Sequence, residues 1–467
     1  MALALMEHQR QGVAFLTEGR HGLLAFEQGL GKTLVAIDAF RRLRDGGDAD
    51  RMLVICPNSL KRNWLAEIAK FAPSLAVDIA EGPPKARRSV FATSSADVVV
   101  TSYETARTEV TAILALTSAR RTVLVLDESH AAKNWRSLTS ASVRHFAPRC
   151  DYRWLLSGTP VTNTPADLYT QIQIVAPGNR ELGSLESFLA RVEEDPSAQF
   201  AKSTFDRLVL RKTKEECLDL PEKSFTDVVV ELPPWQRKLY DEMRTQMVCA
   251  IRGMSGEQFR AFASTALAQL TRLSQLASNP SLLLPDCVQT PAKFEVLDGI
   301  VSDIMSVPGR KVIVWSSYVK NIEALQERFA DFGAVAIFGG VPNNERQDIA
   351  ARFQSDPATR VLIANAAAAG TGFTLTSASF TIYESMSWRY DHYAQSQDRN
   401  HRIGQTQPVN YLRLIAADTI DEAVSRALVR KSGMARNLLS DTNPEPLLSR
   451  LTPQQMCDLI SNNALPD

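Results

Sequence analysis

The sequence predicts an α/β protein with two doubly wound parallel-sheet lobes and helical protrusions inserted between them. Short apolar runs rich in Val, Ile and Leu alternate with helical patterns from residue 22 to about residue 157. The same alternation returns between residues 311 and 415, and the intervening residues 165 to about 285 follow a mainly helical period. Strands buried on both faces of a parallel sheet have such continuous apolar runs, and a βαβα order is typical of doubly wound domains.

Each lobe has five expected strands, separated by helical stretches. In the first half of the chain they are the apolar runs at residues 22–26, 51–56, 97–102, 122–127 and 152–157. In the second half they are the runs at residues 311–315, 334–338, 360–364, 380–384 and 409–415. A further run, "FTDVVVEL" at 225–232, interrupts the helical stretch, and "PDCVQTP" at 285–291 has the composition of a linker.

These patterns divide the 467 residues into the following expected domains. The first lobe takes residues 1–231 and carries a helical protrusion at about residues 165–224. A second protrusion takes residues 232–285, and the second lobe takes residues 286–430. Residues 431–467 are expected to form a C-terminal brace or tail.

The charge balance leaves the class of partner open. Lys+Arg and Asp+Glu both number 52, so the formal net charge is zero. A nucleic-acid groove needs a local basic face, which a sum over the whole chain does not reveal. The composition therefore neither supports nor excludes a nucleic-acid partner.

The cysteines and the apolar segments predict a cytoplasmic protein that is not secreted. The six cysteines are scattered and form no CxxC pair, so neither a zinc site nor a disulfide framework is indicated. The first residues lack the pattern of a signal peptide. No apolar run reaches the ~18 residues of a membrane helix. We therefore expect reduced cysteines and no membrane partner.

A phosphate-binding loop is expected at "EQGLGKT", residues 27–33, between the first strand and a helix. Gly29 and Gly31 would let the backbone approach phosphate oxygens, and the helix N-terminus would add a positive field. Lys32 would reach the β and γ phosphates, and Thr33 would ligate Mg²⁺. Phe26 occupies the first Gly position of GxxxxGK[ST], so an ordinary Gly-rich turn stays open as an alternative.

Two adjacent carboxylates, Asp127 and Glu128, end the apolar run in "LVLDESHAAKN". In phosphate-loop NTPases a carboxylate at the end of a neighbouring strand holds Mg²⁺. A second carboxylate can orient or deprotonate the attacking water. The alternative is a solvated acidic turn, which the upstream phosphate loop disfavours.

The segment "QSQDRNHRIGQ", residues 395–405, concentrates polar side chains in the second lobe. Arg399 and Arg402 are three residues apart and would share a face if they lay on a helix. An arginine finger on the second lobe would make catalysis depend on lobe closure, and such a finger is worth about 10³- to 10⁵-fold in rate. The alternative is a surface helix whose charges have no such role. The Gly-containing turn "AAGTGFTL", residues 368–375, is a weaker signal for contact with nucleotide or nucleic acid.

Together, and in this order, these motifs resemble the Swi/Snf-type ATPases of helicase superfamily 2. The resemblance covers roughly residues 5 to 430 and includes "MEHQRQGVAFL", "FEQGLGKT", "LDESHAAKN", "LLSGTPVTNTPADLY" and "DRNHRIGQ". Phe26, Gln28 and Ala369 depart from the usual family residues. Since no appended reader domain is recognisable, the chain resembles the minimal bacterial, archaeal or viral members, and the implied setting is the cytoplasm of a bacterial or phage-infected cell. The Ser-Gly-Thr-Pro segment favours the annealing-helicase branch of the family.

The resemblance implies two RecA-like lobes that use ATP and Mg²⁺, and it assigns the site residues by motif. The catalytic residues would be Lys32, Asp127, Glu128, Arg399 and Arg402. ATP would contact Gln9, which reads the adenine, together with Gly29, Leu30, Gly31, Lys32, Thr33, Gly372 and Gln395. Mg²⁺ would be held by Thr33 and, through water, by Asp127. Coupling between the ATP site and the rest of the motor would involve His130, Ser157, Gly158 and Thr159. Phosphates of DNA would contact Ser59, Lys61, Ser102, Ser316, Ser317 and Thr371.

The implied function is an ATP-dependent double-stranded-DNA translocase that remodels forks, anneals strands or displaces bound proteins. It would act as a monomer, with a protein partner supplying specificity. Two alternatives stay open: an RNA-stimulated superfamily 2 helicase, and a non-catalytic two-lobe nucleic-acid-binding scaffold. The "DESH" and "HRIGQ" pairing argues against the first alternative. The five intact catalytic residues argue against the second.

Overall fold

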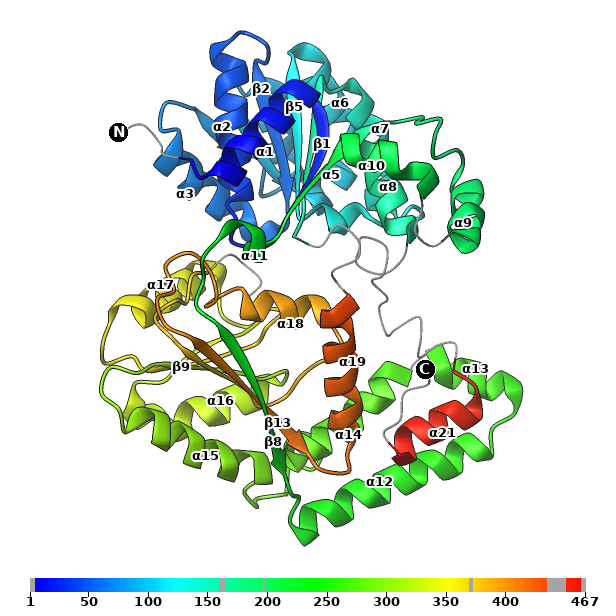
Figure 1. The fold of residues 1–467 in the computed structure, drawn as a ribbon, viewed down its shortest axis with the longest axis vertical. Coiled ribbons are helices and arrows are strands. Elements are labelled where there is room, and N and C mark those ends of the chain that lie inside the picture. The colour runs from blue at the N-terminus through cyan, green and yellow to red at the C-terminus, as the bar shows by residue number, and fades with distance from the viewer. Residues whose placement is uncertain are drawn as a thin grey trace. The chain divides into compact units, whose positions relative to one another are not determined.

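The computed structural model describes residues 5–158, 165–195, 199–264, 266–368, 373–434 and 451–462. Between Asp219 and Leu220 the chain divides into two compact units. We call the unit up to Asp219 the first lobe and the unit from Leu220 the second lobe (Figure 1). Each contains one parallel β-sheet, so the predicted fold class is confirmed.

In its described part, the first lobe is built on seven parallel strands in the order β3-β4-β2-β5-β6-β1-β7. The strands are β1 (His21–Phe26), β2 (Arg51–Cys56), β3 (Val77–Ile79), β4 (Val98–Ser102), β5 (Thr122–Asp127), β6 (Tyr152–Leu156) and β7 (Val209–Lys212). Because β6 lies between β1 and β5, the carboxyl ends of these three strands are neighbours.

Both faces of the first sheet are covered, which explains the continuous apolar runs. In β5, Val123 and Val125 pack in the core under α1, α2 and α3, whereas Leu124 and Leu126 pack in the core on the opposite face. Figure 1 shows α1, α2 and α3 on one side of the sheet and α6, α7 and α8 on the other. The α-helices of this lobe are α1 (Glu7–Gly19), α2 (Lys32–Asp45), α3 (Lys61–Phe71), α4 (Pro84–Thr93), α5 (Tyr103–Thr108), α6 (Val110–Ala119), α7 (Leu138–Phe146), α8 (Pro165–Val175), α9 (Leu185–Glu194), α10 (Lys202–Leu208) and α11 (Lys214–Cys217). Its 3₁₀ turns are η1 (Asn58–Leu60), η2 (Ser129–Ala132), η3 (Ala147–Arg149) and η4 (Gln199–Ala201).

In its described part, the second lobe has six parallel strands in the order β10-β11-β9-β12-β13-β8. The strands are β8 (Lys223–Val230), β9 (Val312–Trp315), β10 (Val335–Ile337), β11 (Val361–Ala364), β12 (Phe380–Tyr383) and β13 (Val409–Ala416). The helices are α12 (Pro234–Arg252), α13 (Gly256–Ser264), α14 (Ala266–Ser278), α15 (Ala292–Met305), α16 (Val319–Arg328), α17 (Asn343–Ser355), α18 (Tyr390–Gln397), α19 (Ile420–Met434) and α21 (Pro453–Asn462), with 3₁₀ turns η5 (Pro280–Leu282) and η6 (Ala330–Phe332).

The predicted end of the first lobe at residue 231 is wrong, because β8 belongs to the second sheet. All eight residues of β8 pair with β13, from Lys223 opposite Val409 to Val230 opposite Ala416. The backbone hydrogen bonds of this pairing fix β8 to the second lobe. The predicted protrusion at 165–224 also contains a strand of the first sheet, because β7 pairs with β1.

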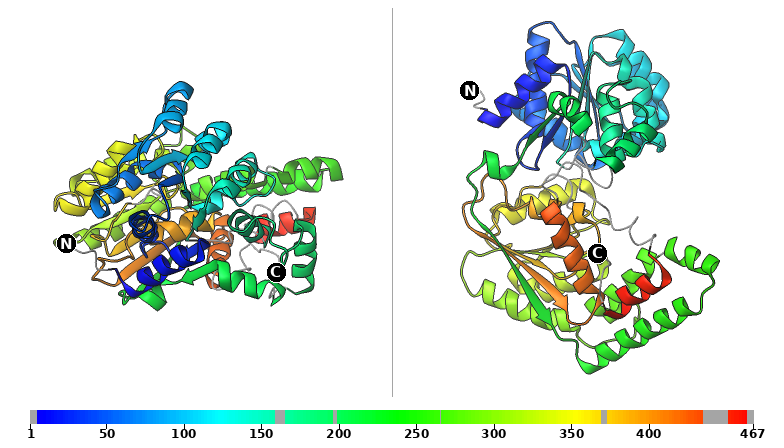
Figure 2. Two further views of the ribbon diagram at one scale, coloured as in Figure 1. Left: turned by 90° about the horizontal axis from the view of Figure 1, so that it is seen from above. Right: turned by 45° about the vertical axis from the view of Figure 1, so that its right-hand side comes forward.

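Within the predicted C-terminal brace, residues 431–434 complete α19 and residues 453–462 form the helix α21. Figure 1 and the right-hand view of Figure 2 show α21 lying along α12, and the two helices are in contact. Met456, Leu459 and Ile460 of α21 are buried in the core of the second lobe. In the described part of the chain, no helix combines the length and apolar character needed to cross a membrane.

Candidate nucleotide-binding site

The predicted phosphate loop follows β1 and opens α2, as the sequence indicated. Gly29 and Gly31 have φ angles of 89° and 82°, a left-handed conformation that favours glycine. Gly31 is the N-cap of α2 and has no side chain with which to cap the helix. The Lys32 ammonium donates hydrogen bonds to the carbonyl oxygens of Phe26 at 2.8 Å and Glu27 at 3.3 Å. The lysine is therefore held within the loop that surrounds it.

Helix α1 fastens the loop from one side. Gln9 Nε2 donates to the carbonyl oxygen of Leu30 at 3.3 Å, and His8 Nε2 lies 3.0 Å from the same oxygen. Gln9 Oε1 accepts a hydrogen bond from the Met6 backbone N–H at 3.0 Å. The structure thus brings Gln9 to the loop, where it supports Leu30. Its predicted contact with adenine stays a prediction.

The two carboxylates lie at the carboxyl end of β5, and each oxygen of Asp127 has a donor. Trp64 Nε1 donates to Asp127 Oδ2 at 2.9 Å, and the Glu128 backbone N–H donates to Oδ1 at 2.9 Å. Burial and the neighbouring Glu128 charge raise the pKa of Asp127 from its usual 3.8 to about 6. A cation beside Asp127 would favour its charged form, which is the environment expected for a magnesium ligand.

Glu128 is held in an unusual backbone conformation. Its φ and ψ angles are 49° and 53°, which is the left-handed region for a residue other than glycine. Such strain is found mainly where the surroundings fix a functional side chain. His130, in η2, places its Nδ1 at 3.3 Å from Glu128 Oε2. His130 thus lies beside the Glu128 carboxylate.

Strand β6 connects the loop and the acidic pair. Its Leu156 pairs with both Leu24 of β1 and Asp127 of β5. Ser157 donates its backbone N–H to Leu24 O at 3.1 Å. A Cβ added at Gly158 would lie 3.0 Å from Gln28 Cγ and 3.6 Å from Lys32 Nζ. The predicted coupling residues Ser157 and Gly158 therefore adjoin the loop. Thr159 lies outside the described residues.

Three residues that orient the acidic segment were not among the predicted site residues. Trp64 of α3 contacts Asp127 as described above. The Tyr103 hydroxyl donates to the Asp127 carbonyl oxygen at 3.0 Å. Ser129 Oγ donates to Gln171 Oε1 of α8 at 2.7 Å. For two of them the sequence carried one signal, their position after a strand. Trp64 follows β2, which is next to β5, and Tyr103 follows β4, which is one strand further along the sheet.

In the second lobe, Arg399 and Arg402 do not lie on a helix, so the condition for a shared helical face is not met. Helix α18 ends at Gln397, and both arginines lie in the turns that follow. The other motif residues fix these turns. Asn400 Nδ2 donates to Thr381 Oγ1 at 2.9 Å, and Gln405 Nε2 donates to the carbonyl oxygen of Thr376 at 3.1 Å.

The described arginines differ in exposure. Arg399 is buried, with 5% of its surface exposed, whereas Arg402 is half-buried and donates to Phe373 O at 3.4 Å. Gln395 is half-buried on α18. Two further residues predicted for this lobe, Thr371 and Gly372, lie outside the described residues.

Comparison with known families shows to which family this phosphate-loop protein belongs. Residues 8–282 match the SNF2-related domain, and residues 292–404 match the helicase conserved C-terminal domain. The first match alone covers more than half of the chain. The chain belongs to the SNF2-related family. It therefore has the core of an ATP-hydrolysing enzyme.

The relatives that this chain matches are longer than the chain itself. An "uncharacterized ATP-dependent helicase" of Mycoplasma pneumoniae is 30% identical over 456 residues, which are 94% of this chain and 43% of that protein. The "TATA-binding protein-associated factor mot1" of Aspergillus fumigatus is 27% identical over 533 residues, covering 98% of this chain and 28% of that protein. This SNF2-type chain thus spans less than half the length of these relatives. Among solved structures, a Sulfolobus solfataricus SWI2/SNF2 ATPase core in complex with dsDNA is 24% identical, with a TM-score of 0.44 and coverage of 98% and 97% of the two chains.

Two of the predicted DNA contacts in the first lobe of this SNF2-type core are engaged within the chain. The Lys61 ammonium donates to Glu81 Oε2 at 2.8 Å and is largely buried. Ser102 is 4% exposed, and its Oγ caps α5 by accepting from the Thr105 backbone N–H at 3.2 Å. Ser59 lies half-exposed in η1. Of the two serines, Ser59 is the more accessible.

Ser316 and Ser317 follow β9 in the second lobe. Ser316 is 2% exposed, and its Oγ donates to Glu384 Oε2 at 2.7 Å. Ser317 is half-buried, and its backbone N–H donates to Ser385 Oγ at 2.9 Å. In this structure the Ser316 hydroxyl therefore faces inward, and Ser317 is the better placed of the two for contact with a ligand.

The close approach at Gly31 gives a testable prediction. A Cβ at Gly31 would lie 2.5 Å from Gln9 Nε2, and the φ of 82° would strain any other residue. We expect Gly31→Ala to weaken ATP binding about tenfold, as measured by titration with a fluorescent ATP analogue, because a strain of this kind costs about 1–3 kcal/mol.

The matched control is Gly47→Ala. Gly47 also has a positive φ, of 75°, but nothing lies within 4 Å of its added Cβ. It follows the end of α2, away from the loop. Equal affinities for the Gly31 and Gly47 variants would show that the contact with Gln9 does not shape the site.

Proposed function

We propose that this chain is an ATP-dependent double-stranded-DNA translocase. The observation that carries the proposal is the assembly of Lys32, the Asp127–Glu128 pair and Gly158 at the ends of three adjacent strands in an SNF2-related domain. An SNF2-type core that retains this assembly can bind and hydrolyse ATP. A scaffold without catalysis would have no need of a buried lysine, a buried carboxylate and a strained glutamate together.

Different residues of the site would bind the phosphates of ATP, hold Mg²⁺ and accept a proton. Lys32 and the loop backbone bind the phosphates, and Thr33, half-buried on the first turn of α2, supplies a hydroxyl beside them. Asp127 and Thr33 fit a magnesium ion, because oxygen ligands suit this cation and Asp127 is buried with a raised pKa. Mg²⁺, when bound, neutralises phosphate charge. Glu128, oriented by His130, receives the proton of the attacking water.

Duplex DNA is the polymer that the family assignment favours. The pairing of "DESH" with "HRIGQ" is shared with the Swi/Snf-type motors and argues against an RNA helicase. Relatives named for association with the TATA-binding protein suggest, for this chain too, a protein partner that supplies specificity. Contacts would be made mostly to phosphates, so binding would be salt-sensitive and largely independent of sequence. The work performed would be fork remodelling, strand annealing or displacement of bound proteins.

An ATPase assay across polymers tests this proposal. We expect duplex DNA to raise kcat at least about tenfold, in the range expected when binding energy assembles a catalytic site, and single-stranded RNA to have little effect. The panel contains duplex DNA, forked DNA, single-stranded DNA and RNA of equal length. Stimulation by RNA equal to that by duplex DNA would reject the translocase and favour the RNA-stimulated helicase.

Replacement of Arg402 tests whether the second lobe contributes to catalysis. We expect Arg402→Ala to lower kcat about 100-fold, because removing one donor to developing transition-state charge costs about 10² to 10³. ATP affinity, measured separately by titration, should change far less. Arg352→Ala is the control, because Arg352 is an exposed arginine of the same lobe that pairs with Asp356. A rate equal to that of the control would remove Arg402 from catalysis.

A further inference from the structure

A buried polar cluster at the carboxyl ends of β9 and β12 has Glu384 at its centre. Glu384 directly follows β12 and is 0% exposed. Its Oε2 accepts from Ser316 Oγ at 2.7 Å. Its Oε1 accepts from Ser278 Oγ and from Asn321 Nδ2, the latter at 3.4 Å. The carboxylate therefore joins the last residue of α14 to the first residue after β9.

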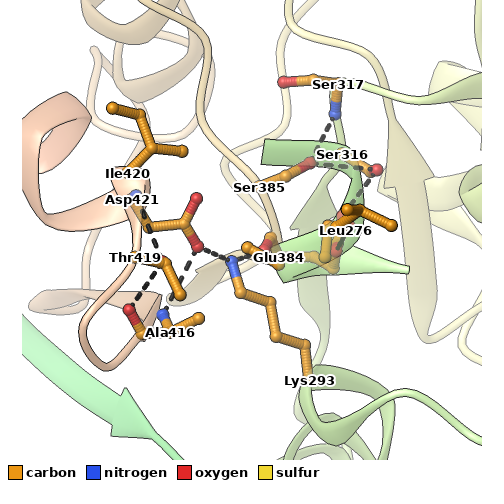
Figure 3. Close-up of polar contacts among 12 residues, drawn as sticks. Leu276, Lys293, Ser316, Ser317, Glu384, Ser385, Ala416, Thr419, Ile420 and Asp421 are labelled. Atoms are coloured by element: carbon orange, nitrogen blue, oxygen red, sulfur yellow. Dashed lines mark hydrogen bonds and ion pairs between the residues drawn. The ribbon is translucent and has the colours of Figure 1, made fainter. Parts of the chain in front are cut away.

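Lys293 anchors the backbone of Glu384. Its ammonium donates to the Glu384 carbonyl oxygen at 2.9 Å and pairs with Asp421 Oδ2 at 2.5 Å. Figure 3 shows Lys293 reaching between Asp421 and Glu384. Lys293 is 1% exposed, so this contact is shielded from water and resists competition by solvent. Glu384 is thus fixed from α15 and, through Asp421, from α19.

The loop that leaves β9, residues 316–318, depends on the same cluster for its shape. The Ser317 backbone N–H donates to Ser385 Oγ at 2.9 Å, and Figure 3 shows Ser385 beside Ser316. The Tyr318 backbone N–H donates to Ser316 Oγ at 3.3 Å. Asn365 Nδ2 donates to the carbonyl oxygens of Ser316 and Ser317 at 3.3 and 3.2 Å. Rotation of Ser316 away from Glu384 would therefore also disturb the Tyr318 amide.

The helical protrusion of the second lobe is tied to the other side of the cluster. Gln236 of α12 is 0% exposed and donates to the carbonyl oxygen of Leu276 on α14 at 2.9 Å. Gln236 Oε1 accepts from the Ala292 backbone N–H at the start of α15 at 3.1 Å. Ser278 then carries the connection from α14 to Glu384. A displacement of α14 would therefore be transmitted to the 316–318 loop through the Glu384 carboxylate.

We propose that Glu384 is a positioning residue that couples the end of α14 to the 316–318 loop and presents Ser317 to the phosphate backbone of DNA. The part concerning DNA rests on the proposed function. The part concerning the loop rests on the hydrogen bonds alone. A carboxylate suits this role because, when ionised, it only accepts, and here it receives donors from α14, α16 and the loop together.

Hydrogen–deuterium exchange of the full chain tests the positioning role without DNA. Glu384→Gln keeps the size of the side chain and replaces one accepting oxygen with a donating amide. We expect the Ser317 and Tyr318 amides to exchange about tenfold faster, because one hydrogen bond is worth about 0.5–1.5 kcal/mol. Ser278→Ala should accelerate the same amides, although Ser278 does not contact the loop directly. Asp298→Asn changes a half-buried carboxylate of α15 that pairs with Arg328, and this matched control should leave exchange unchanged.

The half-saturating concentration of duplex DNA in the ATPase assay tests the second part. We expect it to rise about tenfold in Glu384→Gln and Ser278→Ala, the factor that one hydrogen bond accounts for, and not in Asp298→Asn. Unchanged exchange at residues 317 and 318 in Glu384→Gln overturns the positioning role. Accelerated exchange in Glu384→Gln alone overturns the coupling to α14.

The two parts fail separately. Faster exchange with an unaltered DNA requirement shows that the loop is not part of the DNA contact. A wild-type chain that duplex DNA does not stimulate rejects the proposed function, and exchange then still decides the positioning role. If Glu384→Gln does not fold, Ser278→Ala gives the comparison, since it removes one donor to the carboxylate and leaves the acceptors of both amides in place.

Discussion

Replacing Glu128 with Gln is expected to lower kcat for ATP hydrolysis about 10³-fold, within the range that general acid–base catalysis contributes. The amide keeps the size of the side chain but cannot accept the proton of the attacking water. ATP binding should be retained, because Lys32, Thr33 and Asp127 are unchanged. Single-turnover hydrolysis and titration with a fluorescent ATP analogue separate the two quantities.

The matched control for this variant is Glu104→Gln. Glu104 is an exposed carboxylate on α5 of the same lobe. Its replacement removes the same charge without touching the β5 segment. Turnover by Glu128→Gln equal to that of the control would refute the role of Glu128 as the base.

Lys32→Ala is expected to abolish detectable turnover, a loss of about 10³-fold or more, because in the proposed mechanism the ammonium stabilises the transferring phosphoryl group. ATP affinity should fall as well, which distinguishes this variant from Glu128→Gln. The carbonyl oxygens of Phe26 and Glu27 also lose their donor. The circular dichroism spectrum should stay that of a folded chain, since the apolar core does not include this side chain.

Lys85→Ala is the control for Lys32→Ala. Lys85 is an exposed lysine on α4 of the same lobe. Residual hydrolysis by Lys32→Ala at the level of the control would mean that the loop does not bind the phosphates. Loss of the folded spectrum would be assigned to the loop contacts of Lys32 and tested with Lys32→Arg, which keeps a cation.

Much of the fold was predictable because its strands are buried on both faces. The β5 run from Thr122 to Leu126 is apolar enough to be recognised without its neighbours. Two strands were missed for the opposite reason: β3 has three residues and β7 has four, all half-buried or exposed. The strand β8 was recognised but placed in the wrong lobe. It lies at the edge of the sheet, and its partner β13 begins 186 residues later, at Val409 opposite Lys223.

The candidate site was predictable where spacing along the chain carries the chemistry. The loop before Lys32 and the Asp127–Glu128 pair are local patterns. The residues that orient them are not local: Trp64 reaches Asp127 from 63 residues away. Helical spacing does not describe Arg399 and Arg402, because α18 ends before them and the Asn400 and Gln405 side chains support turns instead. No local pattern shows that the Ser316 hydroxyl points to a buried carboxylate.

As a duplex-DNA translocase, this chain would use ATP hydrolysis to move along duplex DNA. Displacement of a third strand from a DNA triplex measures that movement directly, because tracking on the duplex removes the third strand without separating the two others. Wild-type chain with ATP and Mg²⁺ should release the third strand, and Glu128→Gln should not. Duplex-stimulated hydrolysis without release of the third strand, from either end of the duplex, would contradict the account.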